Sequence, residues 1–203
     1  SQDIHDKEQA WISLESDLRL AIERDELQLY YQPKITAHKH KITGLEALIR
    51  WFKSDGRMVS PAEFIPIAEQ TGLIITIGDW VIEQAFSQLK AWQSLKTLDD
   101  NFSIAINLSA KQFQHVDFIN NIKQRLAETD IDPQFIELEI TESLLIGDID
   151  KSILIMHQLK DIGFKLSIDD FGTGYSSLSY LKQFPIDKLK IDQAFVMDIE
   201  SNN

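Results

Sequence analysis

The chain has 203 residues, of which 43% are apolar and 26% charged, a composition typical of one globular domain rather than a disordered segment. Its 32 acidic and 20 basic residues give a formal net charge of −12, which argues against the basic surface that DNA binding needs. The absence of cysteine excludes disulfides, thiolate metal ligands and a cysteine nucleophile. No stretch approaches the ~20 apolar residues of a membrane helix, and residues 1–8 do not resemble a secretion signal. We therefore expect a cytoplasmic domain, whether or not its parent protein is anchored to a membrane.

Hydrophobic periodicity predicts one helix and two strands at the start of the chain. Apolar residues recur at helical spacing in residues 10–26, which predicts an amphipathic helix. Residues 27–32 form a first predicted strand that Pro33 is expected to close, and residues 41–51 hold a second. The gap between them is shorter than the dozen or more residues of a helical crossover. These two strands should therefore be antiparallel neighbours.

From residue 60 onward, predicted strands and helices alternate. Ser60 is a candidate N-cap, with Pro61 at the first helical position and Glu63 completing a capping box. Helices are expected at residues 61–70, 79–94, 118–127, 149–161 and 177–183, and strands at 102–109, 135–142, 165–170 and 187–192. This alternation predicts a parallel α/β arrangement wound right-handedly, with six strands in all.

Polar groups end five of the six predicted strands, where a barrel enzyme assembles its site. They are Glu46 and Arg50, then Asn107, Glu139, the pair Asp169 and Asp170, and finally Lys190 with Asp192. Burying several carboxylates together is costly unless cations neutralise them. Oxygen ligands suit Mg²⁺, Mn²⁺ or Ca²⁺ better than zinc or copper. Two such ions ~4 Å apart would activate a water and stabilise in-line displacement at phosphorus.

Plainer interpretations of the single residues stay open at this point. Glu46 and Arg50 share one face of their strand, where they can form an internal ion pair. Asn107 can cap a neighbouring element. Glu137 lies further from the strand end and is expected to be a surface or salt-bridge residue. Lys190 can be either a structural counter-ion or a proton acceptor.

Seven co-ordered motifs resemble the EAL family, bacterial phosphodiesterases that open cyclic di-GMP. Glu46-Ala47-Leu48, within the stretch 44–51, is similar to the signature that names the family. The other six motifs are Tyr31-Gln32-Pro33, Pro61 to Glu69, Ile106-Asn107-Leu108-Ser109, Glu139-Ile140-Thr141-Glu142-Ser143, Asp169 to Leu178 and Leu189-Lys190-Ile191-Asp192. The resemblance runs from about Leu14 to the end of the chain.

The resemblance implies an α/β fold, a TIM-type (β/α)8 barrel with an antiparallel first strand. About six of the eight strands lie in this chain, which is short of the ~250 residues of a typical barrel by two βα units. Residues 1–10 would be linker or expression residues, and residues 11–203 an EAL domain that is incomplete at its C-terminus.

The resemblance also implies roles for particular residues. Glu46, Asn107, Glu139 and Asp169 would bind metal, and Asp170 would engage a second metal. Lys190 would position or deprotonate the attacking water. Glu142 would hold the loop after the fifth strand, which couples metal binding to dimerisation in such proteins. Gln32, Leu48, Arg50 and Ser176 would line the dinucleotide site, with Arg50 on a phosphate.

The implied reaction converts cyclic di-GMP to linear pGpG with Mg²⁺ or Mn²⁺ in a two-metal site, where Ca²⁺ would be a non-productive occupant. A homodimer and an upstream signalling domain in the parent protein are the expected partners. Two other hypotheses remain: a receptor that binds cyclic di-GMP without hydrolysing it, and a scaffold that dimerises through the apolar helix 79–94.

Overall fold

A twisted sheet forms the centre of the protein in the computed structural model, which describes residues 2–37, 40–95, 102–145, 148–172 and 181–192. The strands lie side by side in the order β1-β2-β4-β5-β6-β7, and a short β3 pairs with β2. Their bounds are β1 Leu27–Ile35, β2 Ile42–Phe52, β3 Met58–Val59, β4 Ser103–Leu108, β5 Ile136–Thr141, β6 Lys165–Phe171 and β7 Lys188–Ile191.

Strand direction follows the prediction from loop length. β1 runs antiparallel to β2, whereas β2, β4, β5, β6 and β7 are all parallel to their neighbours. The described strands do not close into a barrel through hydrogen bonds, because β1 and β7 are the two edges of the sheet. Since β2, β4, β5 and β6 are parallel, their carboxyl ends lie along the same edge of the sheet.

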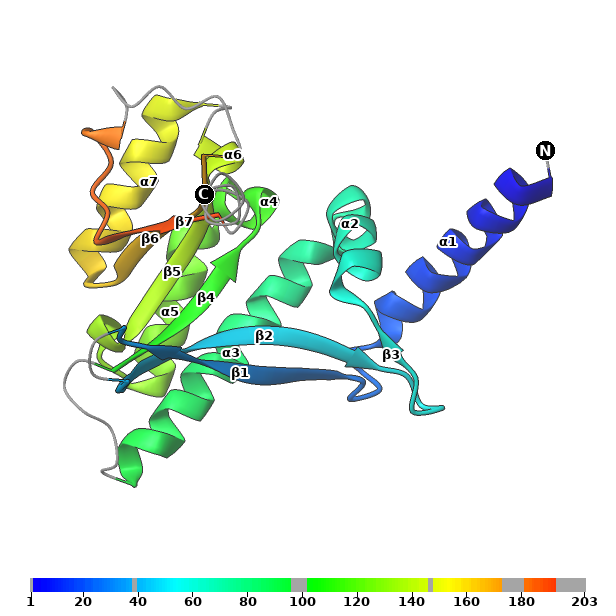
Figure 1. The fold of residues 1–203 in the computed structure, drawn as a ribbon, viewed down its shortest axis with the longest axis horizontal. Coiled ribbons are helices and arrows are strands. Elements are labelled where there is room, and N and C mark those ends of the chain that lie inside the picture. The colour runs from blue at the N-terminus through cyan, green and yellow to red at the C-terminus, as the bar shows by residue number, and fades with distance from the viewer. Residues whose placement is uncertain (1, 38–39, 96–101, 146–147, 173–180, 193–203) are drawn as a thin grey trace, which may run out of the picture.

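Helices cover one face of the sheet. The helices are α1 Gln2–Leu20, α2 Pro61–Thr71, α3 Leu73–Ser94, α4 Ala110–Phe113, α5 Phe118–Thr129, α6 Glu142–Leu145 and α7 Ile149–Ile162, with a 3-10 turn η1 at Pro133–Phe135. Figure 1 shows α3, α5 and α7 following the sheet, while α1 projects away from it. No single helix within the described residues has the length and apolarity to cross a membrane; α2 and α3 meet those criteria only as a pair bent by 118°.

The two faces of the sheet differ in polarity because side chains alternate along each strand. The face toward the helices is apolar and forms the core; it includes Ala47, Ile106, Leu138, Ile140, Leu166 and Ile168, all of them buried. The opposite, inner face carries Lys34, Glu46, Asn107, Glu137, Glu139, Asp169 and Lys190. Charged groups are thus concentrated on the face that a closed barrel would enclose.

The capping prediction is confirmed, and the structure corrects the end of the first strand. The Ser60 side chain accepts from Ala62 N, the Glu63 side chain accepts from the Ser60 backbone, and Pro61 begins α2. β1 does not stop before Pro33 but continues through it to Ile35. β1 is an edge strand here, and an edge strand needs no N–H toward a second neighbour, so proline is tolerated.

The helix predicted at residues 10–26 lies at Gln2–Leu20 in the structure. Its end differs from the prediction because a contact with a residue far along the chain holds Glu26 outside the helix. α1 ends at Leu20, and Asp25 adopts a left-handed φ of 53°. The buried carboxylate of Glu26 then accepts a hydrogen bond of 2.9 Å from Trp51 Nε1. This contact holds Glu26 beside β2, where a continuing helix could not reach.

The helix predicted at 79–94 begins six positions earlier, at Leu73, and includes Gly78. Gly78 is not a helix breaker in this position. A Cβ there would lie 2.3 Å from the Gln112 side chain, so glycine permits the close approach of α3 to α4. The helix predicted at 177–183 lies largely outside the described residues. β3, α4, α6 and η1 were not predicted.

Candidate metal centre

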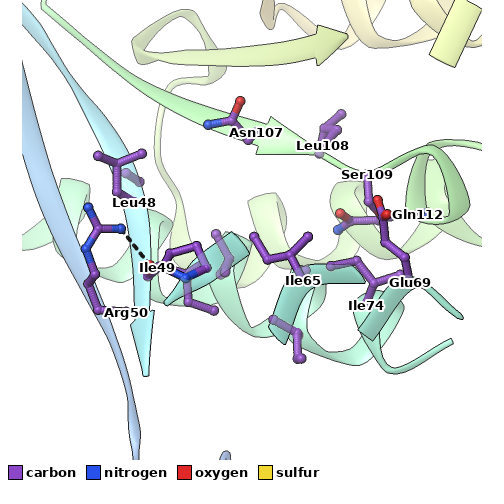
Figure 2. A pocket seen from close by; sticks show the side chains of 15 residues that line it. Leu48, Ile49, Arg50, Ile65, Glu69, Ile74, Asn107, Leu108, Ser109 and Gln112 are labelled. Atoms are coloured by element: carbon purple, nitrogen blue, oxygen red, sulfur yellow. Dashed lines mark hydrogen bonds between the residues drawn. The ribbon is translucent and has the colours of Figure 1, made fainter. Parts of the chain in front are cut away.

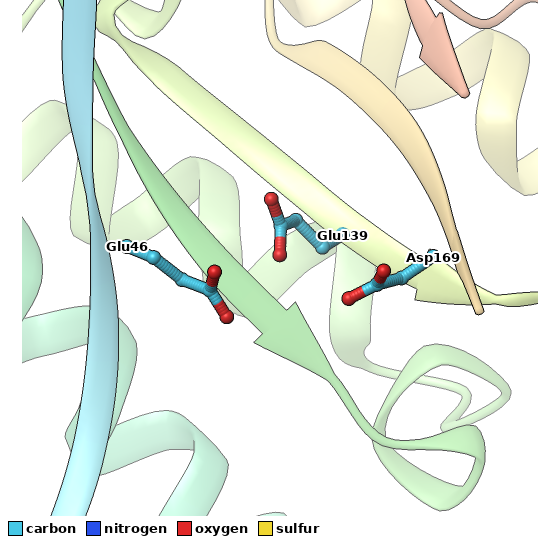
Figure 3. A group of neighbouring side chains, drawn as sticks. All are labelled: Glu46, Glu139 and Asp169. Carbon is cyan, nitrogen blue, oxygen red and sulfur yellow. The ribbon is translucent and has the colours of Figure 1, made fainter. Parts of the chain in front are cut away.

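Three carboxylates from three different strands converge on the inner face. Glu46 comes from β2, Glu139 from β5 and Asp169 from β6, and each offers a ligand oxygen within 4.8 Å of the others (Figure 3). Glu139 is only 1% exposed. The alternation along the strands and the pairing of neighbouring strands bring together residues that are far apart in the sequence, as predicted, although Glu46 lies in the middle of β2 and not at its end.

The ammonium group of Lys190, on β7, lies among these carboxylates. Its Nζ donates to Glu139 Oε2 and to Asp169 Oδ2, both at 2.7 Å, and lies 3.6 Å from Glu46 Oε2. Burial opposes the charge of Lys190, but the hydrogen bonds to Asp169 and Glu139 outweigh it and raise the pKa of the amine. Lys190 therefore supplies positive charge at the centre of an acidic cluster.

The acidic cluster fits a hard divalent cation. Burial raises the pKa of the Glu139 carboxyl above its usual value, even though Lys190 and Lys34 beside it act in the opposite direction. The two lysines thus do not fully compensate the cost of burying this carboxylate, and a divalent cation would stabilise its ionised form. Three carboxylate oxygens form a donor set that suits Mg²⁺ or Mn²⁺.

Asn107, the last residue but one of β4, lies beside the same cluster. Its amide nitrogen donates to Glu46 Oε1 at 2.9 Å. The two orientations of an asparagine amide are assigned from the hydrogen bonds around it, and the opposite orientation would turn the amide oxygen toward Glu46 and a cation bound there. Asn107 is therefore within reach of the centre as a fourth oxygen donor.

A bulge at the end of β6 separates Asp169 from Asp170. The pairing of β6 with β7 shifts register between Ile168 and Phe171, and Asp170 has a φ of 53°. Burial, followed by the charges of Asp169 and Asp192, raises the pKa of Asp170. Asp169 joins the three-carboxylate cluster, while Asp170 is exposed next to it and does not belong to it.

The chain after β6 is tied to α6. Gly172 N donates to Glu142 Oε2 at 2.7 Å, and Glu142 is only 2% exposed. Glu142 thus contacts the backbone at the first residue after β6. Ser176 lies outside the described residues.

A pocket of about 250 Å³ lies between β2, the end of β4 and the helices α2 to α4, and it adjoins the acidic cluster through Asn107, which donates to Glu46. Leu48, Arg50 and Asn107 are among the residues that line this pocket (Figure 2). Arg50 does not pair with Glu46 in this structure; its Nη1 donates to Ile49 O at 2.8 Å, and its guanidinium lies 6.0 Å from the centre of the Tyr30 ring. Gln32 is exposed on β1 opposite Glu46.

Lys34 lies near the centre although the sequence predicts a loop there. Pro33 predicts the end of the first strand, which would leave Lys34 in the loop that follows, whereas β1 continues to Ile35. Its Nζ lies 3.3 Å from Glu137 Oε1 and 3.4 Å from Glu139 Oε1. Continuing the strand alternation from Gln32 through the proline would have placed Lys34 on the inner face.

Glu137 was predicted to be either a surface residue or a salt-bridge residue. It forms salt bridges and is not on the surface. It is 1% exposed, and Lys188 Nζ donates to its Oε2 at 2.5 Å. The sequence could not exclude a surface position, because Glu137 precedes the strand end and its lysine partners come from β1 and β7.

Comparison with known proteins assigns the chain to a family. The EAL domain family model matches residues 15–203. Signaling protein YkoW of Bacillus subtilis is 47% identical over 199 residues, and the cyclic di-GMP phosphodiesterase PdeR of Escherichia coli is 40% identical over 189 residues. A solved structure of the PaMucR phosphodiesterase in complex with c-di-GMP is 42% identical, has a TM-score of 0.87, and aligns over 93% of this chain and 75% of that chain.

These alignments cover nearly all of this chain but only part of the relatives. They include 98% of the chain and 24% of YkoW, and 93% of the chain and 28% of PdeR. The chain therefore spans about a quarter of the length of the curated relatives it matches. The order of the strands, the antiparallel first pair and the sequence motifs agree with the family match: the chain belongs to the EAL domain family, and its sheet is the larger part of a TIM-type α/β barrel.

Proposed function

We propose that this chain is a metal-dependent phosphodiesterase domain that hydrolyses cyclic di-GMP to linear pGpG. The observation that carries the proposal is the convergence of Glu46, Glu139 and Asp169 around Lys190. Relatives named as cyclic di-GMP phosphodiesterases, at 40% identity or more, support the same substrate.

In this proposal the chain's carboxylates hold the cations. Glu46, Glu139 and Asp169 provide the oxygen ligands, Asn107 adds its amide oxygen, and Asp170 engages a second ion. Bound Mg²⁺ or Mn²⁺ would supply a water of lowered pKa and neutralise charge at the phosphate. Ca²⁺ takes more ligands at longer distances, so we expect it to occupy the site without supporting turnover.

The other residues orient the water and the substrate. Lys190 donates to two of the carboxylates in this structure, and from the same position it can hold the attacking water by a hydrogen bond. Arg50 provides a guanidinium for a phosphate oxygen. Leu48 and the adjoining pocket offer an apolar surface for a base. The pocket volume of about 250 Å³ is below the ~300–1,000 Å³ of sites that enclose a whole drug-sized ligand. We therefore place one base there and not the whole dinucleotide. Gln32 and Ser176 complete the proposed dinucleotide site.

The proposed regulation of the metal site by dimerisation rests on one hydrogen bond, between Gly172 and Glu142. The hydrogen bond from Gly172 N to Glu142 connects α6 to the segment that follows Asp170, and we propose that through it Glu142 links metal binding to the formation of a homodimer. An upstream signalling domain and a cytoplasmic location also remain predictions.

A receptor that binds cyclic di-GMP without hydrolysing it is the second candidate function. Such a receptor has no need for a metal-binding acid cluster, whereas this chain keeps the carboxylates on all three strands. The retained cluster favours the enzyme.

The test compares two glutamate variants in Mn²⁺ with cyclic di-GMP. Glu46→Gln keeps the size of the side chain but removes a charged ligand, so we expect it to abolish pGpG formation. Glu83→Gln is the matched control, because Glu83 is an exposed glutamate on α3 that pairs with Arg125. Equal turnover in Glu46→Gln and wild type would contradict the site, and binding without any turnover in wild type would favour the receptor.

A further inference from the structure

We propose that Lys34 is a positioning residue that fixes the orientation of the buried ligand Glu139, and that Glu137 in turn holds Lys34. The proposal rests on the function proposed above, because it assumes that Glu139 binds a metal. It concerns a second layer of charged residues beneath the acidic cluster.

The two oxygens of Glu139 have different partners. Lys34 Nζ lies 3.4 Å from Oε1, and Lys190 Nζ lies 2.7 Å from Oε2. The side chain of Glu139 is fully buried, so the described surroundings and not water determine how the carboxylate is turned. Oε1 thus faces Lys34, and Oε2 faces Lys190, the ammonium group that also lies against Asp169 and Glu46.

The sheet is built so that Lys34 can reach across it. Lys34 lies on β1 opposite Gly44, and Gly44 lies opposite Ser103 on β4. Ala105, two residues further along β4, pairs with Glu137 on β5. Glycine, serine and alanine leave space on the inner face between β1 and β5. The lysine side chain crosses this space and is itself only 23% exposed.

Glu137 gives Lys34 a fixed partner at the far side of this space. Its Oε1 lies 3.3 Å from Lys34 Nζ, while its Oε2 accepts from Lys188 at 2.5 Å and from Ser103 Oγ at 3.4 Å. Opposite charges therefore alternate along one series of ion pairs, in the order Lys188, Glu137, Lys34, Glu139, Lys190. Metal-ligand orientation commonly depends on such outer partners.

A purely electrostatic role for Lys34 predicts the opposite result from a positioning role. Removing a positive charge close to a cation site strengthens cation binding if the ligands stay in place. If Lys34 instead orients Glu139, its loss weakens cation binding despite the removed repulsion. The sign of the change in Mn²⁺ affinity therefore separates the two roles.

The experiment measures Mn²⁺ binding directly, by titration calorimetry and by the EPR signal of free Mn²⁺, on the 203-residue chain without nucleotide. We expect Lys34→Met to raise the Kd for Mn²⁺ by about tenfold or more, the range found when outer partners of metal ligands are removed. Lys34→Arg, which keeps a donor and a charge, should restore most of the affinity. Unchanged or tighter Mn²⁺ binding in a folded Lys34→Met protein would overturn the proposal.

Lys188→Met is the matched control. Lys188 pairs with Glu137 through its other oxygen, Oε2, and forms no ion pair with Glu139 within the described residues, so its loss should change the Mn²⁺ Kd by less than about threefold. An equal loss of affinity in both variants would show a general loss of structure and would overturn the specific role of Lys34. If Lys34→Met does not fold, Lys34→Gln carries the same expectation.

The outcome for wild type separates the two proposals. If wild type binds Mn²⁺ but does not convert cyclic di-GMP, the proposed enzyme fails while the effect of Lys34 on metal affinity is still measured. If wild type does not bind Mn²⁺, both proposals fail.

Discussion

Replacing Lys190 should destabilise the metal-free protein and make its stability depend strongly on Mn²⁺. In Lys190→Met, the fully buried Glu139 loses its partner at 2.7 Å and keeps only Lys34 at 3.4 Å, while Asp169 loses its ammonium partner. Breaking a buried ion pair on one side costs about 3–5 kcal/mol. Since Lys34 remains, we expect about 3 kcal/mol, the lower end of that range.

A bound cation should replace the missing charge. Mn²⁺ at 100 times its Kd stabilises the folded state by about 2.7 kcal/mol, close to the expected loss. The variant should also bind Mn²⁺ more tightly than wild type, because no ammonium group occupies the centre.

Thermal unfolding in EDTA and in Mn²⁺ measures both effects. For a chain of this size, a loss of about 3 kcal/mol corresponds to a midpoint about 6–12 °C lower in EDTA. Mn²⁺ should raise the midpoint of Lys190→Met more than that of wild type. Lys160→Met, which removes the exposed pair with Asp187, is the control and should show no added dependence on Mn²⁺. A variant as stable as wild type in EDTA, or one that gains less from Mn²⁺ than wild type, would refute the reasoning.

Three further predictions concern the scaffold and are tested by urea unfolding. Gly44→Ala would place a Cβ 2.4 Å from the Ser103 carbonyl oxygen, so strands β2 and β4 must separate. We expect the free energy of unfolding to fall by about 1–3 kcal/mol. An unchanged unfolding midpoint would show that the contact is easily relieved. Ser60→Ala removes the cap of α2 and should cost about 1 kcal/mol, with no loss meaning that the cap is redundant. Burial raises the pKa of Asp79 more than Arg125, 3.9 Å away, lowers it. A raised carboxyl pKa in the folded state favours folding as the pH falls. Wild type should therefore gain stability relative to Asp79→Asn on acidification through that pKa. A loss of stability of wild type relative to Asp79→Asn over this pH range would contradict the assignment.

Local sequence signals predicted the elements whose cause is local. The short gap after the first strand was enough to predict the antiparallel pairing of β1 with β2, and the Ser60, Pro61 and Glu63 pattern was enough to place the start of α2. Carboxylates at successive strand ends predicted a common rim, because parallel strands must end at the same edge of a sheet.

What the sequence did not reveal depends on contacts between distant residues. The helix predicted to begin at residue 79 includes Gly78, and the reason for a glycine there is visible only from Gln112 packed against it. Glu26 reads as the end of a helix until Trp51 is seen to hold it. Lys34 reads as a loop residue, although it reaches Glu139 on a strand three positions away across the sheet. In each case the partner lies far along the chain, where periodicity and propensity carry no information.

The most direct test of the account is metal-dependent turnover by the 203-residue chain itself. The chain is incubated with cyclic di-GMP in Mn²⁺, Mg²⁺, Ca²⁺ or EDTA, the products are separated by chromatography, and Mn²⁺ occupancy is measured on the same sample. The account predicts pGpG in Mn²⁺ and Mg²⁺ and none in Ca²⁺ or EDTA. Cyclic di-GMP that remains intact while the Mn²⁺ site is fully occupied would contradict it.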